Sequence, residues 1–247
     1  MSLDIADLTE RDIAKTIDHS LLRPELDDRQ IDEGCALAAK YDVASVCCRP
    51  ADIRRAVGLL AGTDVAVGAT VGFPHGNHRT ETKVAEARQA LADGATELDM
   101  VLQIGALKSG RDADVQADIA AVVAVAHAAG AIVKVIFENA YLTDGEKVRA
   151  CRLSEAAGAD FVKTSTGFAP SGATHDDLRL MRANTSPQIQ IKAAGGVRTL
   201  DALLAVMELG VTRVGATATE AIIEDFRARK AGLAVAPAGS AKLGGGF

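Results

Sequence analysis

The stretch GADFVKTS, residues 158–165, joins a turn glycine to a short β-rich run, and the same order of features recurs along the chain. It recurs as GATELDMV (94–101), GAIVKVIF (130–137) and GVTRVGAT (210–217). In each copy the glycine stands where a preceding helix is expected to end, and a strand is expected two or three residues later. Because parallel strands need helical crossovers between them, the repeat predicts consecutive β–α units.

The alternation extends over most of the chain. Helix-like stretches at 81–93, 113–129, 144–157 and 200–209 lie between the candidate strands. Eight strands in about 240 residues predict an α/β fold with a single (β/α)8 TIM barrel, and a doubly wound open sheet is the alternative. The candidate strands begin near Ile17, Ser45, Asp64, Glu97, Ile132, Phe161, Gln188 and Arg213.

The first strand, expected at 15–18, is short, and the count of eight strands depends on including it. The barrel domain is expected to cover residues 1–230. Residues 231–247 are rich in Ala and Gly without periodicity and predict a mobile C-terminal tail.

The composition narrows the classes of partner. The 247 residues carry a net charge of −6, and aromatic residues make up 3% with no Trp, so neither a basic stripe nor a base-stacking platform for nucleic acid is expected. The longest apolar run, 119–133, is shorter than the ~20 residues of a membrane helix, so no membrane partner is expected. The polar N-terminus and the absence of a C-x-x-C pair predict a cytoplasmic protein.

Polar residues interrupt the predicted strands on one face. The outer face of a barrel strand packs against helices and should be apolar, so side chains on the polar face are expected to point into the barrel. Those expected to point inward are Glu97 and Asp99, Lys134 and Glu138, Lys163 and Ser165, and Gln190 and Lys192.

Two interpretations of the inward lysines remain open at this point. One is a buried ion network of Lys134, Lys163, Lys192, Asp99 and Glu138 that only stabilises the barrel. The other is an amine nucleophile. A lysine with an ordinary pKa of ~10.4 is neutral in about one molecule in 2,500 at pH 7, and burial beside a second cation raises that fraction.

Glycine-rich turns follow the last three predicted strands. They are Ser165-Thr166-Gly167, Gly195-Gly196-Val197 and Gly215-Ala216-Thr217. Such turns bind phosphate through backbone N–H groups in many barrels, so they favour a phosphate-bearing substrate, although ordinary turn glycines are the alternative. His75 and His78 lack a supporting carboxylate pattern, and no metal site is predicted.

Seven motifs occur in order along the chain, and the matching region spans 17 to about 217. They are IDHSLLRPE (17–25), SVCCRP (45–50), VGFPHG (71–76), ELDMV (97–101), KVIFE (134–138), FVKTSTGF (161–168) and IKAAGGVRT (191–199). With these motifs the chain resembles the deoxyribose-phosphate aldolase family of class I aldolases. The resemblance implies reversible cleavage of 2-deoxy-D-ribose 5-phosphate to D-glyceraldehyde 3-phosphate and acetaldehyde, with no metal or other cofactor.

The resemblance also implies roles for individual residues. Lys163 matches the Schiff-base lysine, Lys192 the lysine that lowers its pKa, and Asp99 the residue that relays protons through a bound water. The remaining matches are to substrate-binding positions: Asp18, Cys47 and Thr166, and, at the phosphate turns, Gly167, Gly195, Gly196, Gly215 and Thr217.

Two positions depart from the family pattern. Ala218 stands where many relatives carry serine, so phosphate is expected to bind more weakly or an uncharged acceptor to be better tolerated. Some relatives end in a tyrosine that assists proton transfer, but this chain ends in Phe247, which has no hydroxyl, so that role is not carried over.

Two other functions are weighed against the aldolase. A phosphosugar isomerase or epimerase on the same barrel would use Asp99 or Glu138 as its base, and a non-catalytic phosphometabolite-binding barrel would use the lysines as anion ligands. The sequence does not determine the oligomeric state, and a homodimer remains an expectation.

Overall fold

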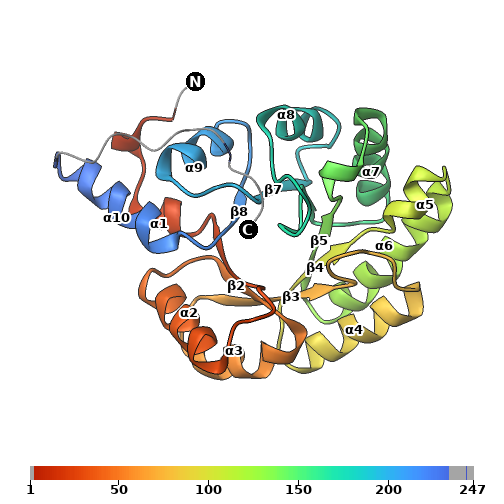
Figure 1. The fold of residues 1–247 in the computed structure, drawn as a ribbon, viewed down its shortest axis with the longest axis horizontal. Coiled ribbons are helices and arrows are strands. Elements are labelled where there is room, and N and C mark those ends of the chain that lie inside the picture. Colours follow the sequence, from red (N-terminus) through yellow and green to blue (C-terminus); the bar gives the residue numbers. More distant parts are fainter. Residues whose placement is uncertain (1–2, 234–242, 244–247) are drawn as a thin grey trace.

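Within the described residues, 3–233 and Leu243, the computed structural model has eight parallel strands that close into a barrel in chain order (Figure 1). β1 pairs with β8, which rules out an open sheet and confirms the (β/α)8 prediction. The strands are β1 (Ile17–Leu21), β2 (Ser45–Cys48), β3 (Ala66–Val71), β4 (Glu97–Val101), β5 (Ile132–Ile136), β6 (Phe161–Lys163), β7 (Gln190–Ala194) and β8 (Arg213–Ala216).

The first strand begins at Ile17, the predicted start, whereas the range 15–18 that was also given for it starts two residues too early. Lys15 still belongs to the end of the preceding helix, where its N–H donates to the carbonyl of Arg11 at 2.9 Å. β3 and β7 likewise begin two residues after the predicted Asp64 and Gln188. The prediction of a short strand at 15–18 is therefore wrong, and β1 continues to Leu21.

Helices surround the barrel, and the four predicted ones lie within two residues of α4, α6, α7 and α9. The turn glycines that ended the predicted helices all have positive φ, from 73° at Gly130 to 103° at Gly94, as a helix C-terminus requires. The helices are α1 (Glu10–Ala14), α2 (Asp28–Lys40), α3 (Ile53–Leu59), α4 (Thr80–Ala92), α5 (Ile104–Lys108), α6 (Asp112–Ala128), α7 (Asp144–Ala156), α8 (His175–Ala183), α9 (Leu200–Met207) and α10 (Thr219–Lys230). Short 3-10 helices are η1 (Ile5–Asp7), η2 (Pro50–Asp52) and η3 (Asn139–Tyr141).

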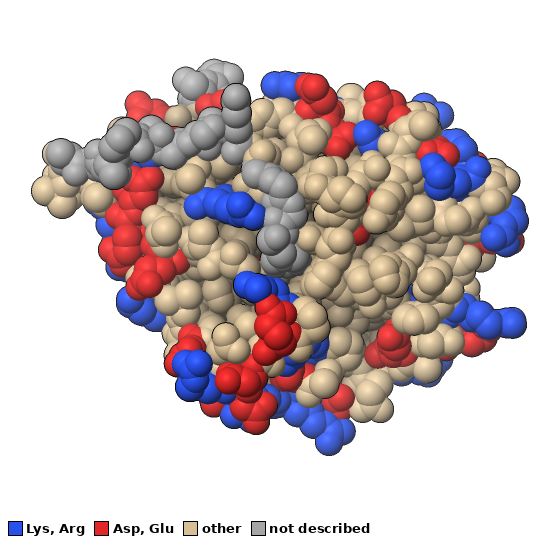
Figure 2. Space-filling model, in the orientation of Figure 1, with Lys and Arg blue, Asp and Glu red and all other residues tan. Residues whose placement is uncertain are grey.

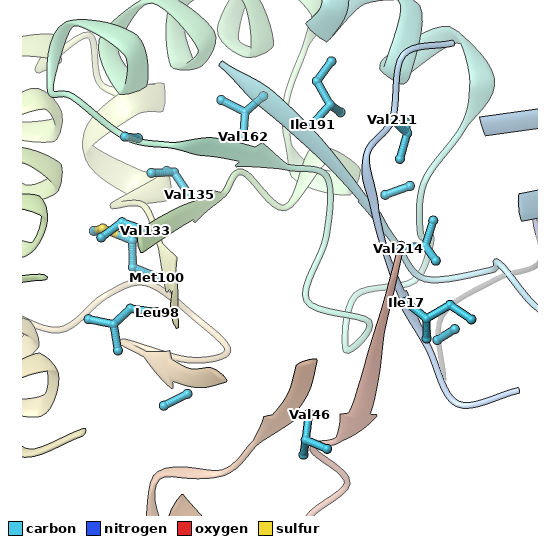
Figure 3. Close-up of a cluster of buried hydrophobic side chains, with 14 of the residues drawn as sticks. Ile17, Val46, Leu98, Met100, Val133, Val135, Val162, Ile191, Val211 and Val214 are labelled. Carbon is cyan, nitrogen blue, oxygen red and sulfur yellow. The ribbon is translucent and has the colours of Figure 1, made fainter. Parts of the chain in front are cut away.

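The hydrophobic core lies between the strands and the helices. Figure 3 shows outward-facing aliphatic side chains from successive strands, and each of them is buried. Burial of one such side chain stabilises the fold by about 1.5–3 kcal/mol. Because strand side chains alternate, this outer layer leaves the inner faces free to carry polar groups. The labelled strand residues are Ile17, Val46, Leu98, Met100, Val133, Val135, Val162, Ile191 and Val214.

A buried ion pair lies within the helical layer, and the sequence patterns did not predict it. Lys83 of α4 donates to Asp118 of α6 at 2.6 Å and to the carbonyl of Val101 at 2.8 Å, and both side chains of the pair are fully buried. Thr80 donates to the same carboxylate. The pair therefore links two neighbouring helices to the end of β4.

The predicted tail, 231–247, falls mostly outside the described residues, and α10 ends at Lys230. None of the helices in the described part of the chain is long and apolar enough to cross a membrane.

Candidate active site

Three lysines surround one carboxylate inside the barrel. Asp99 accepts a hydrogen bond from Lys134 on Oδ1 at 3.0 Å, and its Oδ2 accepts from both Lys163 and Lys192 at 2.7 Å. The strand register produces this cluster, because Asp99 lies opposite Lys134 and Lys163 lies opposite Lys192. All four residues are at most 2% exposed. The two amines that the sequence singled out therefore lie side by side, held by the same oxygen.

A second layer of charge lies next to this cluster. Arg213 donates to Asp18 at 2.5 Å and to Glu97 at 3.0 Å. Lys192 also bonds to Asp18, and Lys134 bonds to Glu97. Arg213 was not predicted as a site residue, although it lies two positions from Gly215 and alternation would have placed it on the same face.

Glu138 does not belong to this ion network, so the prediction that it does is wrong. Its carboxylate accepts instead from the backbone N–H of Thr166 at 3.2 Å and from the Thr166 hydroxyl. The backbone turns at Glu138, where φ is 57°, so the strand alternation that predicted its direction does not continue to this residue. Gln190, the other predicted inward residue of β7, is exposed at the start of its strand, where its side chain accepts from Thr212 at 2.9 Å.

The balance of charge identifies the amine that loses its proton most easily. Within the described residues, the network contains three carboxylates (Asp18, Glu97, Asp99) and four cations (Lys134, Lys163, Lys192, Arg213). An arginine does not lose its proton in proteins, so one lysine is in excess. When one lysine is neutral, three negative and three positive charges remain.

Lys163 is the lysine whose positive charge is least balanced by carboxylates. Among the described residues its amine has one carboxylate neighbour, whereas Lys192 has two and Lys134 three. Burial lowers the pKa of Lys163, Asp99 opposes that shift, and the nearby Lys192 cation reinforces it. Burial also acts on Lys134 and Lys192, but Asp18 and Asp99 outweigh it and hold both of those pKa values above the ordinary value.

Arg213→Gln is expected to move the pKa of Lys163 upward by about one unit, because three lysines then face three carboxylates and none is in excess. Since the neutral amine is the reactive form, the pH dependence of its reaction with acetaldehyde, followed by borohydride trapping, should shift to higher pH. Glu97→Gln should shift it to lower pH, and the double variant should lie near the parent. An unchanged profile in Arg213→Gln would contradict the charge-balance argument.

A cavity of about 150 Å³ opens above the lysines at the C-terminal end of the barrel. Lys163 and Lys192 line it, whereas Asp99 lies beneath them and does not. Gly167, with a φ of 95°, is also outside the lining. The other predicted binding residues all line this cavity: Asp18, Cys47, Thr166, Gly195, Gly196, Gly215 and Thr217.

At two of the turns that line this cavity, the surrounding structure explains why the residue is glycine. Gly195 has a φ of 78°, and a Cβ there would lie 2.8 Å from the Cα of Gly172. A Cβ at Gly215 would lie 3.3 Å from the Cβ of Ala194, which is a tight contact, and 3.7 Å from Cε of Lys192, which is an ordinary one, so glycine avoids crowding against Ala194. The turns thus bring backbone close to the space above the amines.

Charge around the cavity is positive on one side. Arg23 and Arg198 line it together with the turns after β7 and β8. Figure 2 shows that most charged side chains of this face gather around its rim and that much of the surface between them is uncharged. Ala218, which precedes α10, makes no side-chain cap with the described residues, so this helix start has less hydrogen-bonding capacity than a serine would give it.

Cys47 lines the cavity, and burial raises the pKa of its thiol to about 11, so the thiol is neutral near pH 7. His19 faces away from the site: its Nδ1 lies 2.8 Å from the Thr219 hydroxyl, and burial lowers its pKa to about 4. Residues 3–233 and Leu243 contain no cluster of three or more His, Cys, Asp or Glu side chains that could hold a metal ion.

Comparison with known proteins assigns this geometry to a family. Residues 12–235 match the DeoC/LacD family aldolases. The chain is 48% identical over 223 residues to the deoxyribose-phosphate aldolase of Rhodopirellula baltica, covering 90% of this chain and 92% of that one. It is 50% identical over 218 residues to the enzyme of the same name from Thermococcus gammatolerans, covering 87% and 97%.

A solved structure supports the same grouping. The tetrameric deoxyribose phosphate aldolase of Aeropyrum pernix superposes with a TM-score of 0.83 at 28% identity, covering 90% of this chain and 93% of that one. With a matching fold, a family match over most of the chain and close relatives of one kind, the chain belongs to the deoxyribose-phosphate aldolase family, a class I aldolase group of lyases.

Proposed function

We propose that the protein catalyses the reversible cleavage of 2-deoxy-D-ribose 5-phosphate to D-glyceraldehyde 3-phosphate and acetaldehyde through a Schiff base on Lys163. The observation that carries this proposal is the position of Lys163. It is the least neutralised cation of the interior network in the described chain, and it lines the cavity. Burial lowers the pKa of this amine, which increases the neutral, nucleophilic fraction that such a reaction needs.

The chemistry follows from these groups. The Lys163 amine adds to the aldehyde carbon, and loss of water from the carbinolamine gives a protonated imine. A base takes the proton of the sugar hydroxyl next to the bond that breaks, and that carbon becomes the aldehyde of D-glyceraldehyde 3-phosphate, which leaves. The electron pair of the broken C–C bond forms the C=C bond of an enamine, while the imine π pair moves to the nitrogen. Protonation and hydrolysis of the enamine release acetaldehyde and restore the amine.

Asp99 and Lys192 are proposed to move the protons of these steps. Asp99 Oδ2 already accepts from both amines at 2.7 Å, so a proton released at Lys163 has an acceptor and a second donor within reach. Asp99 also stabilises the positive imine once it forms. Lys192, held by two carboxylates, remains protonated and can act as the acid.

The phosphate is proposed to bind at the turns after β7 and β8. Gly195, Gly196 and Gly215 bring backbone to the cavity there, and Thr217 adds a hydroxyl. Arg198 lines the same end and supplies positive charge. A phosphate held at this end would place the aldehyde carbon of an extended sugar toward the lysines.

The isomerase alternative is less consistent with the geometry. Its two candidate bases are Asp99 and Glu138. Asp99 does not line the cavity, and three lysines bond to its two oxygens, so it has no direct access to a C–H group of a bound substrate. Glu138 is engaged by Thr166 and does not line the cavity above the amines.

Borohydride trapping tests the proposed function. Protein incubated with acetaldehyde and sodium borohydride is expected to gain one ethyl group on Lys163, located by peptide mass spectrometry. An isomerase or a binding protein would gain none at this position. Protein treated with borohydride alone is the control. Folded protein that carries no ethyl group on Lys163 would contradict the proposal.

Two further assignments are proposals. The four cysteines are buried and unpaired, which suits the reducing cytoplasm as the place of action.

The relative from Aeropyrum pernix is tetrameric. Self-association of this chain, at least as a homodimer, is proposed by analogy and can be measured by light scattering.

A further inference from the structure

Glu138 occupies a position that the proposed chemistry does not use. It follows β5 and is 2% exposed. Its backbone is fixed on both sides, because the N–H of Phe137 donates to the carbonyl of Lys163 and the N–H of Asn139 donates to that of Thr164, each at 3.0 Å. Glu138 is one of two non-glycine residues with positive φ in the described chain. A strained backbone at a buried acid beside the nucleophile's strand indicates a specific task.

The task is visible in the hydrogen bonds of Thr166. The Thr166 hydroxyl bonds to Oε2 of Glu138, and its oxygen accepts from the backbone N–H of Phe168 at 3.0 Å. The backbone N–H of Thr166 donates to Oε1 of the same carboxylate. Burial raises the pKa of Glu138, whereas the two bonds from Thr166 and the nearby charge of Lys163 oppose that shift and favour the ionised form. An ionised carboxylate only accepts, so the hydroxyl proton of Thr166 points toward Glu138.

These hydrogen bonds leave the Thr166 oxygen with one lone pair that can accept a further hydrogen bond. A hydroxyl has one proton and two lone pairs. The proton is used by Glu138 and one lone pair by Phe168, so the second lone pair is left for a ligand. Thr166 lines the cavity together with Lys163. The oxygen can therefore act toward the cavity as an acceptor but not as a donor.

We infer that Glu138 is a positioning residue that fixes Thr166 as a hydrogen-bond acceptor for a hydroxyl of the sugar bound at Lys163. This inference rests on the proposed aldolase function and deepens it, because it makes the site selective for hydroxyaldehydes. An aldehyde without a hydroxyl has nothing to donate to Thr166.

Glu138→Gln tests the inference because it reverses the hydrogen-bond direction. The Gln carbonyl can still accept from the backbone N–H of Thr166, but its amide group donates to the Thr166 oxygen, and the threonine proton must then turn to the cavity. Cleavage of 2-deoxyribose 5-phosphate is expected to fall about 10- to 100-fold in kcat/KM, the effect of a lost and reversed hydrogen bond. Trapping of acetaldehyde on Lys163 is expected to stay within about threefold of the parent, since acetaldehyde has no hydroxyl.

Thr166→Val provides the matched control. It removes the hydroxyl while keeping the shape of the side chain, so it should also lose cleavage and keep trapping. Adding Glu138→Gln to Thr166→Val should cause no further loss of cleavage, because the group through which Glu138 acts is already absent. If Glu138→Gln does not fold, Glu138→Asp takes its place, and its loss must again appear in cleavage and not in trapping.

Three results would overturn the inference. The first is a Glu138 variant that cleaves the sugar phosphate like the parent. The second is an equal loss of cleavage and trapping, which would mean a general structural role. The third is a Glu138 effect that persists in full in the Thr166→Val background. Absence of trapping in the parent protein would instead overturn the proposed function itself, so the two failures are distinguishable.

Discussion

Replacing Lys163 by Met is expected to lower the cleavage of 2-deoxyribose 5-phosphate by at least about 10⁴-fold, because among the described residues no other cavity-lining amine is placed to form the imine. Lys192 also reaches the cavity, but two carboxylates keep it protonated. The measurement is kcat with purified variant, combined with the borohydride experiment, in which the ethyl group should disappear.

The variant should remain folded, and the charge balance gives the reason. With Lys163 gone, three cations and three carboxylates remain in the network, and Asp99 still accepts from Lys134 and Lys192. A melting temperature close to that of the parent is therefore expected. Lys163→Arg is the contrasting control: it keeps a permanent cation in excess and should be both inactive and less stable. Turnover of Lys163→Met within tenfold of the parent would contradict the assignment of the nucleophile.

Lys192→Met is expected to reduce turnover at pH 7 by about 10²- to 10⁴-fold, the usual range for loss of an acid–base group. Two effects combine. The variant loses a proton donor, and the pKa of Lys163 rises because a neighbouring cation is gone and Asp99 Oδ2 is left to Lys163 alone. Activity increases with pH as Lys163 loses its proton, so a higher pKa moves that increase to higher pH.

The measurement is the pH dependence of kcat/KM for parent and variant. Part of the lost activity should return at about pH 9–10, where a lysine with an ordinary pKa begins to deprotonate. Lys192→Arg separates the two effects, since it keeps the cation but is a poor proton donor: its profile should stay near that of the parent while its maximum falls. Parent-like turnover of Lys192→Met at neutral pH would remove Lys192 from the mechanism.

Much of the fold was predictable because each β–α unit carries its own local signal. Gly94, Gly130, Gly158 and Gly210 each mark a helix end whose positive φ is costly for other residues, and a strand begins two or three residues after each of them. Strand starts were less certain. A residue such as Lys15 suits the end of a helix as well as the start of a strand, and the hydrogen bond that decides between them is not visible in the sequence.

The site was predictable in part for a similar reason. A lysine in an apolar strand is conspicuous, and alternation placed Lys163, Lys192 and Asp99 on inner faces, where the structure brings them together. Arg213 was missed because an arginine at a strand start is usually solvated. Glu138 was assigned to the wrong partners because alternation fails where the backbone takes a positive φ.

The buried pair in the helical layer has a practical consequence for immobilised catalysts. Lys83 is as fully enclosed as the lysines of the barrel, and burial lowers its pKa as well. It does not line the cavity above the barrel lysines, however, and its amine is engaged by Asp118 and a carbonyl. On an aldehyde-activated resin, attachment should therefore occur through exposed lysines such as Lys40 and Lys108. The Lys83–Asp118 ion pair between α4 and α6 should therefore be unchanged after coupling to the resin.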